Sequence, residues 1–242
     1  MKYNVLFRVS LMFLVIFCGI PSSFAQDEAA YVKKGKDFEV DGQGTHEVWN
    51  TVAWIDIPQR RISGTAYSTR VKMIYSETGI YFLFNNEDAK ITSTLTEDFA
   101  DLWKEDVVEV FFWTDENYAF YFEYELSPAN YELPILVPNV EGSFLGWRPW
   151  NYEGERKTRH ATSIQKKGKK ITGWTAEFFI PFALLKPMSN VPPRPGTKWR
   201  VNMYRLDYDH EESSAWAWKP VTTNFHDYKN FGTIIFQDEE TK

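Results

Sequence analysis

The sequence predicts an all-β fold, a jelly-roll-like β-sandwich of two antiparallel sheets with a few single-turn helices. Short runs of alternating apolar and polar residues recur along the chain, and turn-forming residues separate them. Helical periodicity is confined to single turns near 97–102 and 182–185. Aromatic residues make up 17% of the chain, and most of them are expected to fill the core between the two sheets.

Three hairpins and two later segments account for the predicted strands. Each hairpin consists of two strand-like runs around a short polar or glycine-containing turn. The predicted strands are 70–75 and 80–85, 106–113 and 118–126, 161–166 and 171–180, then 199–208 and 232–236. The stretch 127–159 is predicted to be irregular, and a loop of that length in a compact domain is usually functional or mobile.

The first 25 residues resemble a signal peptide. Lys2 and Arg8 form a positive segment, and the apolar run that follows is too short to cross a bilayer comfortably. Small residues before position 26 predict cleavage after Ala25, hence export to the periplasm or the extracellular space with no membrane insertion afterwards. The expected organisation is a signal peptide at 1–25, a disordered leader at 26–37 and one domain at 38–238.

Charge and cysteine content exclude several classes of function. The formal net charge is −6, and cleavage would remove two basic and no acidic residues, giving −8. A nucleic-acid partner is therefore not expected, because such partners favour a basic face. The only cysteine, Cys18, would leave with the signal peptide. This excludes a thiol nucleophile, a cysteine-ligated zinc and an iron–sulfur cluster.

The central hairpin has two chemically different faces. From Asp106 onward the residues alternate, so that Val108, Val110 and Phe112 share a face that belongs in the core. Placing Glu109 opposite Glu123 keeps both faces uniform, whereas a slip by one residue would mix them. The sequence therefore predicts that the carboxylates and Phe111, Tyr121 and Glu125 lie together on the outer face.

The chain resembles the family 9 carbohydrate-binding modules from Asp41 to Phe236. Each part of the resemblance is short, but the parts occur in the order and spacing of the family. They are Asp41-Gly42, Trp49, Ala53, Tyr81-Phe82 with Asp88, the segment from Trp103 to Phe111, Trp174 to Glu177 with Ile180 to Phe182, Gly196 with Trp199 to Asn202, Trp218 to Pro220, and Phe231-Gly232.

The resemblance implies non-catalytic recognition of a sugar, often at a chain end, by two aromatic side chains that grip one ring. Trp103 corresponds to one of these aromatic residues and Glu109 to the carboxylate that accepts hydrogen bonds from sugar hydroxyls. Asn202 and Tyr204 lie on the strand that lines the same site, and Arg205 is a further candidate contact.

Two departures from the family pattern concern the ligand, and a third feature concerns a metal. Phe225 stands where the family has its second tryptophan, and Glu123 stands where a basic residue is expected. Some members bind structural calcium, and Asp88 and Asp106 are the acidic candidates for its ligands.

Other interpretations of these residues remain open. Glu109 and Glu123 could form a glycosidase or lyase pair, or could be neutralised by Arg200 or Arg205 on neighbouring strands. Trp147 and Trp150 could line an extended groove or could anchor the long loop on the sandwich. The segment from Leu145 to Tyr152 could instead dock onto a glycan-degrading enzyme or a transporter. The expected function is carbohydrate binding, by a polysaccharide or oligosaccharide site, in support of polysaccharide degradation or uptake.

Overall fold

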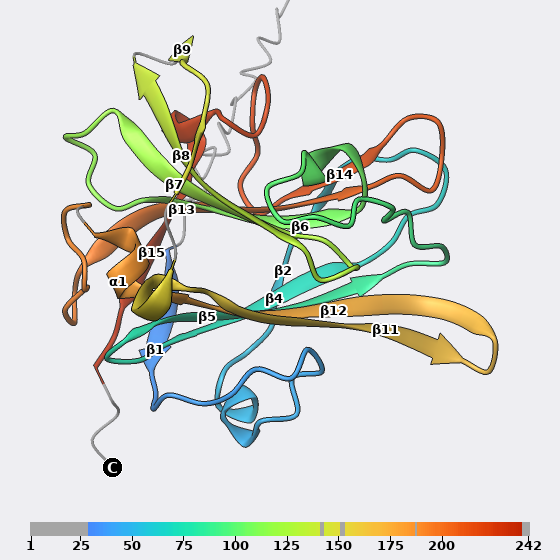
Figure 1. Ribbon diagram of the computed structural model, residues 1–242, viewed down its shortest axis with the longest axis horizontal. Helices are drawn as coiled ribbons and strands as arrows, with labels where there is room; N and C mark the ends of the chain where they lie inside the picture. Colours follow the sequence, from blue (N-terminus) through green and yellow to red (C-terminus); the bar gives the residue numbers. More distant parts are fainter. Residues whose placement is uncertain (1–28, 141–142, 151–152, 187, 239–242) are drawn as a thin grey trace, which may run out of the picture.

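Two β-sheets face each other in the computed structural model, which describes residues 29–140, 143–150, 153–186 and 188–238 (Figure 1). The predicted all-β sandwich is confirmed. The predicted signal peptide lies outside the described residues. Within the described residues, no helix is long and apolar enough to span a membrane.

The upper layer in Figure 1, here called sheet A, carries the site described below. Its strands are β3 (Gln59–Arg61), β6 (Val107–Trp113), β7 (Phe120–Leu126), β8 (Glu132–Val140), β9 (Ser143–Phe144), β10 (Arg148–Pro149), β13 (Lys198–Asp207), β14 (Ser214–Ala217) and β15 (Gly232–Phe236). The main order is β10-β8-β7-β6-β13-β15, with β14 between β13 and β3, and with β9 on β8.

The lower layer, sheet B, has the order β4-β5-β12-β11 with β2 on β4. Its strands are β2 (Ile55–Asp56), β4 (Thr69–Tyr75), β5 (Gly79–Glu87), β11 (Arg159–Lys167) and β12 (Lys170–Pro181). The helical elements are short, as predicted. They are η1 (Glu47–Thr51), η2 (Leu102–Lys104), η3 (Gly154–Arg156), α1 (Phe182–Leu185) and η4 (Tyr228–Asn230). The first predicted turn, 97–102, is displaced, since the helical turn begins at Leu102.

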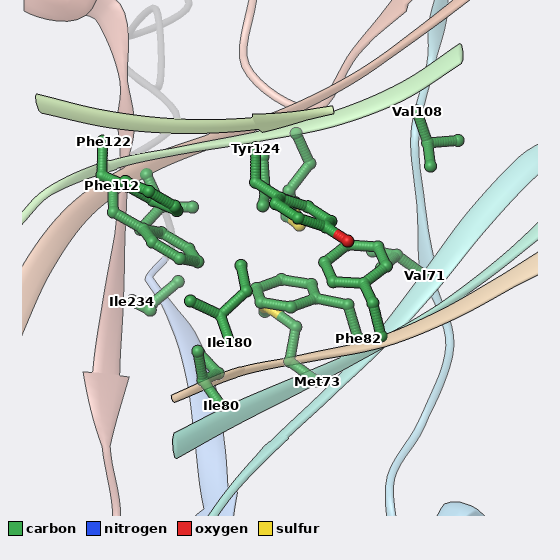
Figure 2. Packing of buried hydrophobic residues seen from close by; sticks show 14 of the residues in the cluster. Val71, Met73, Ile80, Phe82, Val108, Phe112, Phe122, Tyr124, Ile180 and Ile234 are labelled. Atoms are coloured by element: carbon green, nitrogen blue, oxygen red, sulfur yellow. The ribbon is translucent and has the colours of Figure 1, made fainter. Parts of the chain in front are cut away.

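The main core lies between the two sheets, as Figure 2 shows. Phe112 on β6 contacts Phe82 on β5 with ring centroids 5.7 Å apart. Tyr124 on β7 contacts Phe178 on β12 at 4.9 Å. Val108 and Val110 are fully buried in the same cluster. The apolar face predicted for the central hairpin is therefore confirmed, and its burial fixes the carboxylates on the opposite face.

The predicted register of this hairpin is wrong by two residues. Glu109 pairs with Glu125, and Glu123 pairs with Phe111. The physical reason is a longer loop, because β7 begins only at Phe120. A shift by two preserves the side-chain faces, so the error changes the neighbours of each glutamate but not the face it occupies.

Strand β8 occupies part of the stretch that was predicted to be irregular. Pro134 and Pro138 concealed it, because proline within a strand-like run argues against a strand. The carbonyls of these prolines accept hydrogen bonds from Trp150 and Leu145, on the side away from β7. The missing N–H groups point to that same side, so the ladder between β7 and β8 loses no donor.

Strand β1 (Ala30–Lys34) lies inside the range expected to be a disordered leader, which corrects that expectation. It pairs in parallel with β15 through Ala30, Tyr31 and Val32, and then with β4 through its last two residues. Val32 is fully buried between the sheets. Only one side chain of β1 is fully buried. The segment is therefore polar enough that its sequence did not predict a strand.

A buried carboxylate joins several separated parts of the family pattern. One oxygen of Glu177 accepts the N–H groups of Asp41 and Gly42, both at 2.9 Å, and that of Gly44 at 3.3 Å. The other oxygen accepts Trp49 Nε1 at 2.8 Å. The Glu177 side chain is fully buried on β12, and without it the buried donors Gly42 N–H and Trp49 Nε1–H would lack an acceptor.

Substitution Glu177→Ala should lower the free energy of unfolding by about 2–4 kcal/mol, because it leaves several buried donors without an acceptor. Chemical denaturation monitored by tryptophan fluorescence measures this loss. Glu39→Ala is the control, because Glu39 is 87% exposed and only forms a surface ion pair with Arg159. Equal losses in the two variants would contradict the role assigned to Glu177.

Candidate functional site

A cavity of about 520 Å³ opens on the outer face of sheet A. Strands β6 and β7 form its base, while β3, η2, the β9–β10 segment and the loop after β14 surround it. In Figure 1, β9 and the loop drawn in red rise from sheet A on the side away from sheet B. The lining residues are Arg60, Arg61, Trp103, Glu109, Phe111, Glu123, Glu125, Leu133, Ile135, Phe144, Trp147, Leu206, Ala215, Ala217, Val221, Thr223, Asn224, Phe225 and His226.

Three glutamates lie together at the base of the cavity and are here called the carboxyl cluster: Glu109, Glu123 and Glu125. Glu109 and Glu125 are directly opposite each other across β6 and β7, and Glu123 is two residues along β7. Their exposed fractions are 2%, 4% and 1%. In each residue, one buried carboxyl oxygen has no hydrogen-bond partner among the described residues.

Burial raises the pKa of all three carboxyl groups well above the usual range, and the proximity of the carboxyl groups to one another adds to the effect. The His226 ring approaches the cluster, with Nδ1 lying 3.8 Å from Glu123 Oε2. Burial lowers the pKa of His226 to about 4, so this side chain is neutral at pH 7. Within the described part of the chain, the cluster therefore has no counter-charge.

The predicted neutralisation by arginines on neighbouring strands is not found. Arg200 donates to the carbonyl of Phe231 and approaches Glu116 at 3.4 Å, away from the cluster. Arg60 and Arg61 line the cavity, but their guanidinium groups donate to Ala217, Trp218 and Ser213.

Trp103 lies on η2 at the edge of the cavity and is 43% exposed. Its backbone carbonyl accepts a hydrogen bond from the Tyr208 hydroxyl at 2.8 Å. The indole ring is thus held in place through its backbone while its surface stays accessible. Trp103, Glu109, Glu123 and Phe225 are the predicted site residues that the structure brings to the cavity.

Phe225 is supported from behind by another predicted site residue. Its ring stacks on Tyr204 with centroids 4.0 Å apart and planes 12° from parallel. The Tyr204 hydroxyl donates to the Phe225 carbonyl at 2.8 Å. Tyr204 is fully buried and does not line the cavity. Tyr204 instead holds Phe225, which lines the cavity.

Asn202 likewise supports the loop after β14 instead of lining the cavity. Its Nδ2 donates to the Lys219 carbonyl at 3.1 Å, and its Oδ1 accepts the Lys219 N–H at 2.9 Å. The side chain is fully buried. Asn202 and Tyr204, two of the predicted site residues on β13, therefore position the loop that contains Phe225.

The structure does not place Arg205 in the site. Arg205 alternates to the inner face of sheet A, where it is fully buried. Its guanidinium bonds Asp88 at 3.0 Å and Asp207 at 2.5 Å, and it lies over the Trp216 ring at 4.4 Å. The expectation that Arg205 contacts a ligand beside Glu109 is wrong, because odd and even positions of one strand face opposite ways.

Several cavity residues were not predicted as ligand contacts. Glu125 was placed on the correct face by the alternation of β7, which is the signal that could have identified it. Phe144 and Trp147 enter from the β9–β10 segment, so the expectation that the long loop lines a groove holds for Trp147. Trp150 instead donates from Nε1 to the Leu184 carbonyl and packs against the main core.

The model of the protein family described as “Carbohydrate family 9 binding domain-like” matches residues 40–239. The chain belongs to this family. The predicted resemblance is thereby confirmed over most of its length. No curated protein matches the chain.

Solved structures share the fold at low sequence identity. A candidate carbohydrate-binding protein from Bacteroides uniformis aligns with a TM-score of 0.71 and 16% identity, covering 87% of this chain and 99% of its own. A family 9 module from Caldicellulosiruptor kristjanssonii in complex with cellotriose gives 0.64 and 16%, with 88% and 96% covered. Such a module in complex with glucose gives 0.63 and 17%, with 89% and 98% covered.

The two acidic residues suggested as calcium ligands by the family resemblance lie in different surroundings. Both carboxyl oxygens of Asp106 accept backbone N–H groups, from Thr92 at 2.6 Å and Tyr208 at 2.8 Å. One carboxyl oxygen of Asp88 lies within 4.8 Å of one from Asp207 and one from Asp209, close enough for the three to bind a single metal ion. The Arg205 guanidinium bonds two of these three carboxylates, so a metal ion at this position would have to share them with Arg205.

Glu109→Gln should flatten the pH dependence of stability. A carboxyl group with a raised folded-state pKa makes its full contribution below the unfolded value near 4.3, and stability falls as pH rises through the interval to the folded value. Each unit of that interval amounts to about 1.4 kcal/mol. Thermal melts between pH 5 and 8 should show Glu109→Gln gaining stability relative to the native protein as pH increases. A constant difference between the two proteins would contradict the raised pKa.

Proposed function

We propose that the protein binds carbohydrate, without chemistry of its own, in the cavity on the outer face of sheet A. The observation that carries the proposal is the combination of accessible aromatic side chains around the cavity and carboxyl groups at its base. Sugar rings have apolar C–H faces and polar edges, so an aromatic wall and a hydrogen-bonding base match both parts. The family membership and the sugars bound to structural relatives support the same function.

Trp103 and Phe225 are proposed to contact the faces of the sugar, with Phe144 and Trp147 extending the apolar surface. Phe225 is suited to this role because Tyr204 covers one side of its ring and fixes its orientation. A volume of about 520 Å³ lies within the usual range of roughly 300–1,000 Å³ for ligand pockets. The prearranged aromatic surfaces reduce the entropy lost on binding.

A glycosidase mechanism is a weaker fit to the same residues. Hydrolysis needs two carboxyl groups on either side of the scissile bond, one protonated and one ionised. Glu109 and Glu123 instead belong to a cluster of three on one sheet face, and burial favours the neutral form of each. No described cation holds either of them ionised.

We further propose that the protein is exported and supports the degradation or uptake of polysaccharides. Phe144 and Leu145 are 44% and 56% exposed beside the cavity. Docking of this segment on a glycan-degrading enzyme is compatible with sugar binding in the neighbouring cavity.

Trp103→Ala should weaken binding by roughly five- to thirtyfold, because stacking on one aromatic residue contributes roughly 1–2 kcal/mol. A glycan array identifies ligands of the native protein, and isothermal titration calorimetry then compares the variants. Tyr118→Ala is the matched control, since Tyr118 is an aromatic residue that is 50% exposed outside the cavity. Undiminished binding by Trp103→Ala with an intact fold would refute this site.

The native protein should release no reducing sugar from a panel of polysaccharides, because Glu109 and Glu123 project from one sheet face and burial favours the neutral form of both. A reducing-end assay at pH 5, 6 and 7 measures this directly. Product formation that disappears in Glu109→Gln and Glu123→Gln would establish catalysis in place of binding alone.

A further inference from the structure

The carboxyl cluster presents hydrogen-bond acceptors at the base of the cavity. Glu109 Oε1, Glu123 Oε2 and Glu125 Oε2 are buried and have no partner among the described residues. Their residues are at least 96% buried and line the cavity, so these oxygens lie beneath its floor. Unsatisfied polar atoms at such depth are rare in folded proteins and need an explanation.

Among the residues that the structure describes, no lysine or arginine forms an ion pair with these oxygens. The neighbours on the same sheet face are apolar or aromatic, with Leu133 beside Glu125, Ile135 beside Glu123 and Tyr204 beside Glu109. Arg60 and Arg61 are bonded to backbone and serine groups at the edge. The other titratable groups facing the cluster are Tyr121 on β7, Tyr208 after β13, Asp101 before η2 and His226 in the loop after β14.

We propose that the cavity selects a sugar residue bearing a protonated amine, as in a glycan of 2-amino-2-deoxy sugars. An ammonium group has three N–H donors and no acceptor, which matches three carboxyl groups that each have a free oxygen. It also supplies the positive charge that the cluster lacks. A sugar hydroxyl at the same position offers one donor and no charge, so it satisfies the cluster only in part.

The rest of the cavity is compatible with such a ligand. The amine projects from the edge of the pyranose ring, which leaves both ring faces available to Trp103 and Phe225. This proposal rests on the proposed function, because it names the sugar class for the same cavity.

Binding of an ammonium group should displace protons from the cluster. A positive charge within hydrogen-bonding distance favours the ionised carboxylate and lowers the raised pKa of Glu109, Glu123 and Glu125. A neutral sugar brings no charge and therefore does not favour the ionised form of these groups. Proton release on binding therefore distinguishes the two kinds of ligand independently of affinity.

The test compares three trisaccharides that share the β-1,4 linkage and differ at carbon 2: the glucosamine trimer, its N-acetylated counterpart and cellotriose. Isothermal titration calorimetry at pH 6, repeated in buffers of different ionisation enthalpy, measures both affinity and proton release. We expect the glucosamine trimer to bind at least tenfold more tightly than the other two, with proton release for that ligand alone.

Glu123→Gln and Glu109→Gln should each reduce this preference for the amine by tenfold or more, while the circular dichroism spectrum is retained. Glu77→Gln is the charge-matched control, since its side chain is 81% exposed at the turn between β4 and β5. An amine preference that survives both cluster substitutions would overturn the assignment to these residues.

The results separate this proposal from the proposed function. Binding of cellotriose that equals or exceeds binding of the glucosamine trimer overturns the amine proposal and leaves carbohydrate binding intact. Absence of binding to all three trisaccharides and to the glycan array overturns both.

Discussion

Burial of one face of β6 and β7 between the sheets is the constraint on which the site depends. Val108, Val110 and Phe112 have no alternative to the core, and strand geometry then sends Glu109 and its neighbours to the other face. That outer face is itself covered by aromatic residues from the surrounding loops, so carboxyl groups that strand alternation places outside become deeply buried. The buried carboxyl groups at the base of the cavity are therefore a direct consequence of packing on both sides of one sheet.

The loops around the cavity are held by side chains from the sheet beneath them. Tyr204 and Asn202 bond to the backbone of the loop that contains Phe225, and the Tyr208 hydroxyl donates to the Trp103 carbonyl. The sheet therefore positions the aromatic residues through hydrogen bonds to backbone atoms. This arrangement leaves the aromatic ring surfaces available for a ligand and places the loops reproducibly.

The alternation of side chains predicted the faces of β6, β7 and β13, because that pattern follows from local geometry alone. The same alternation excluded Arg205 from the site, since it has the parity of Val201 and Met203, and the prediction that included it ignored this. The register of β6 and β7 could not be predicted, because it depends on the length of the loop between them. Strand β8 was not predicted because proline within a run argues against a strand. The positions that would carry the proline N–H groups point away from β7, so the ladder between β7 and β8 loses no hydrogen bond. The supporting roles of Tyr204 and Asn202 depend on contacts with a loop distant in sequence, which no local pattern reveals.

Strand β1 belongs to both layers, since it pairs first with β15 of sheet A and then with β4 of sheet B. Separation of the layers therefore requires breaking the backbone hydrogen bonds of β1 as well as the core contacts. The two sheets cannot come apart as independent units while this strand remains paired, which favours a single cooperative unfolding transition. A short polar segment near the start of the described chain thus links the folding of the layer that carries the cavity to that of the layer opposite.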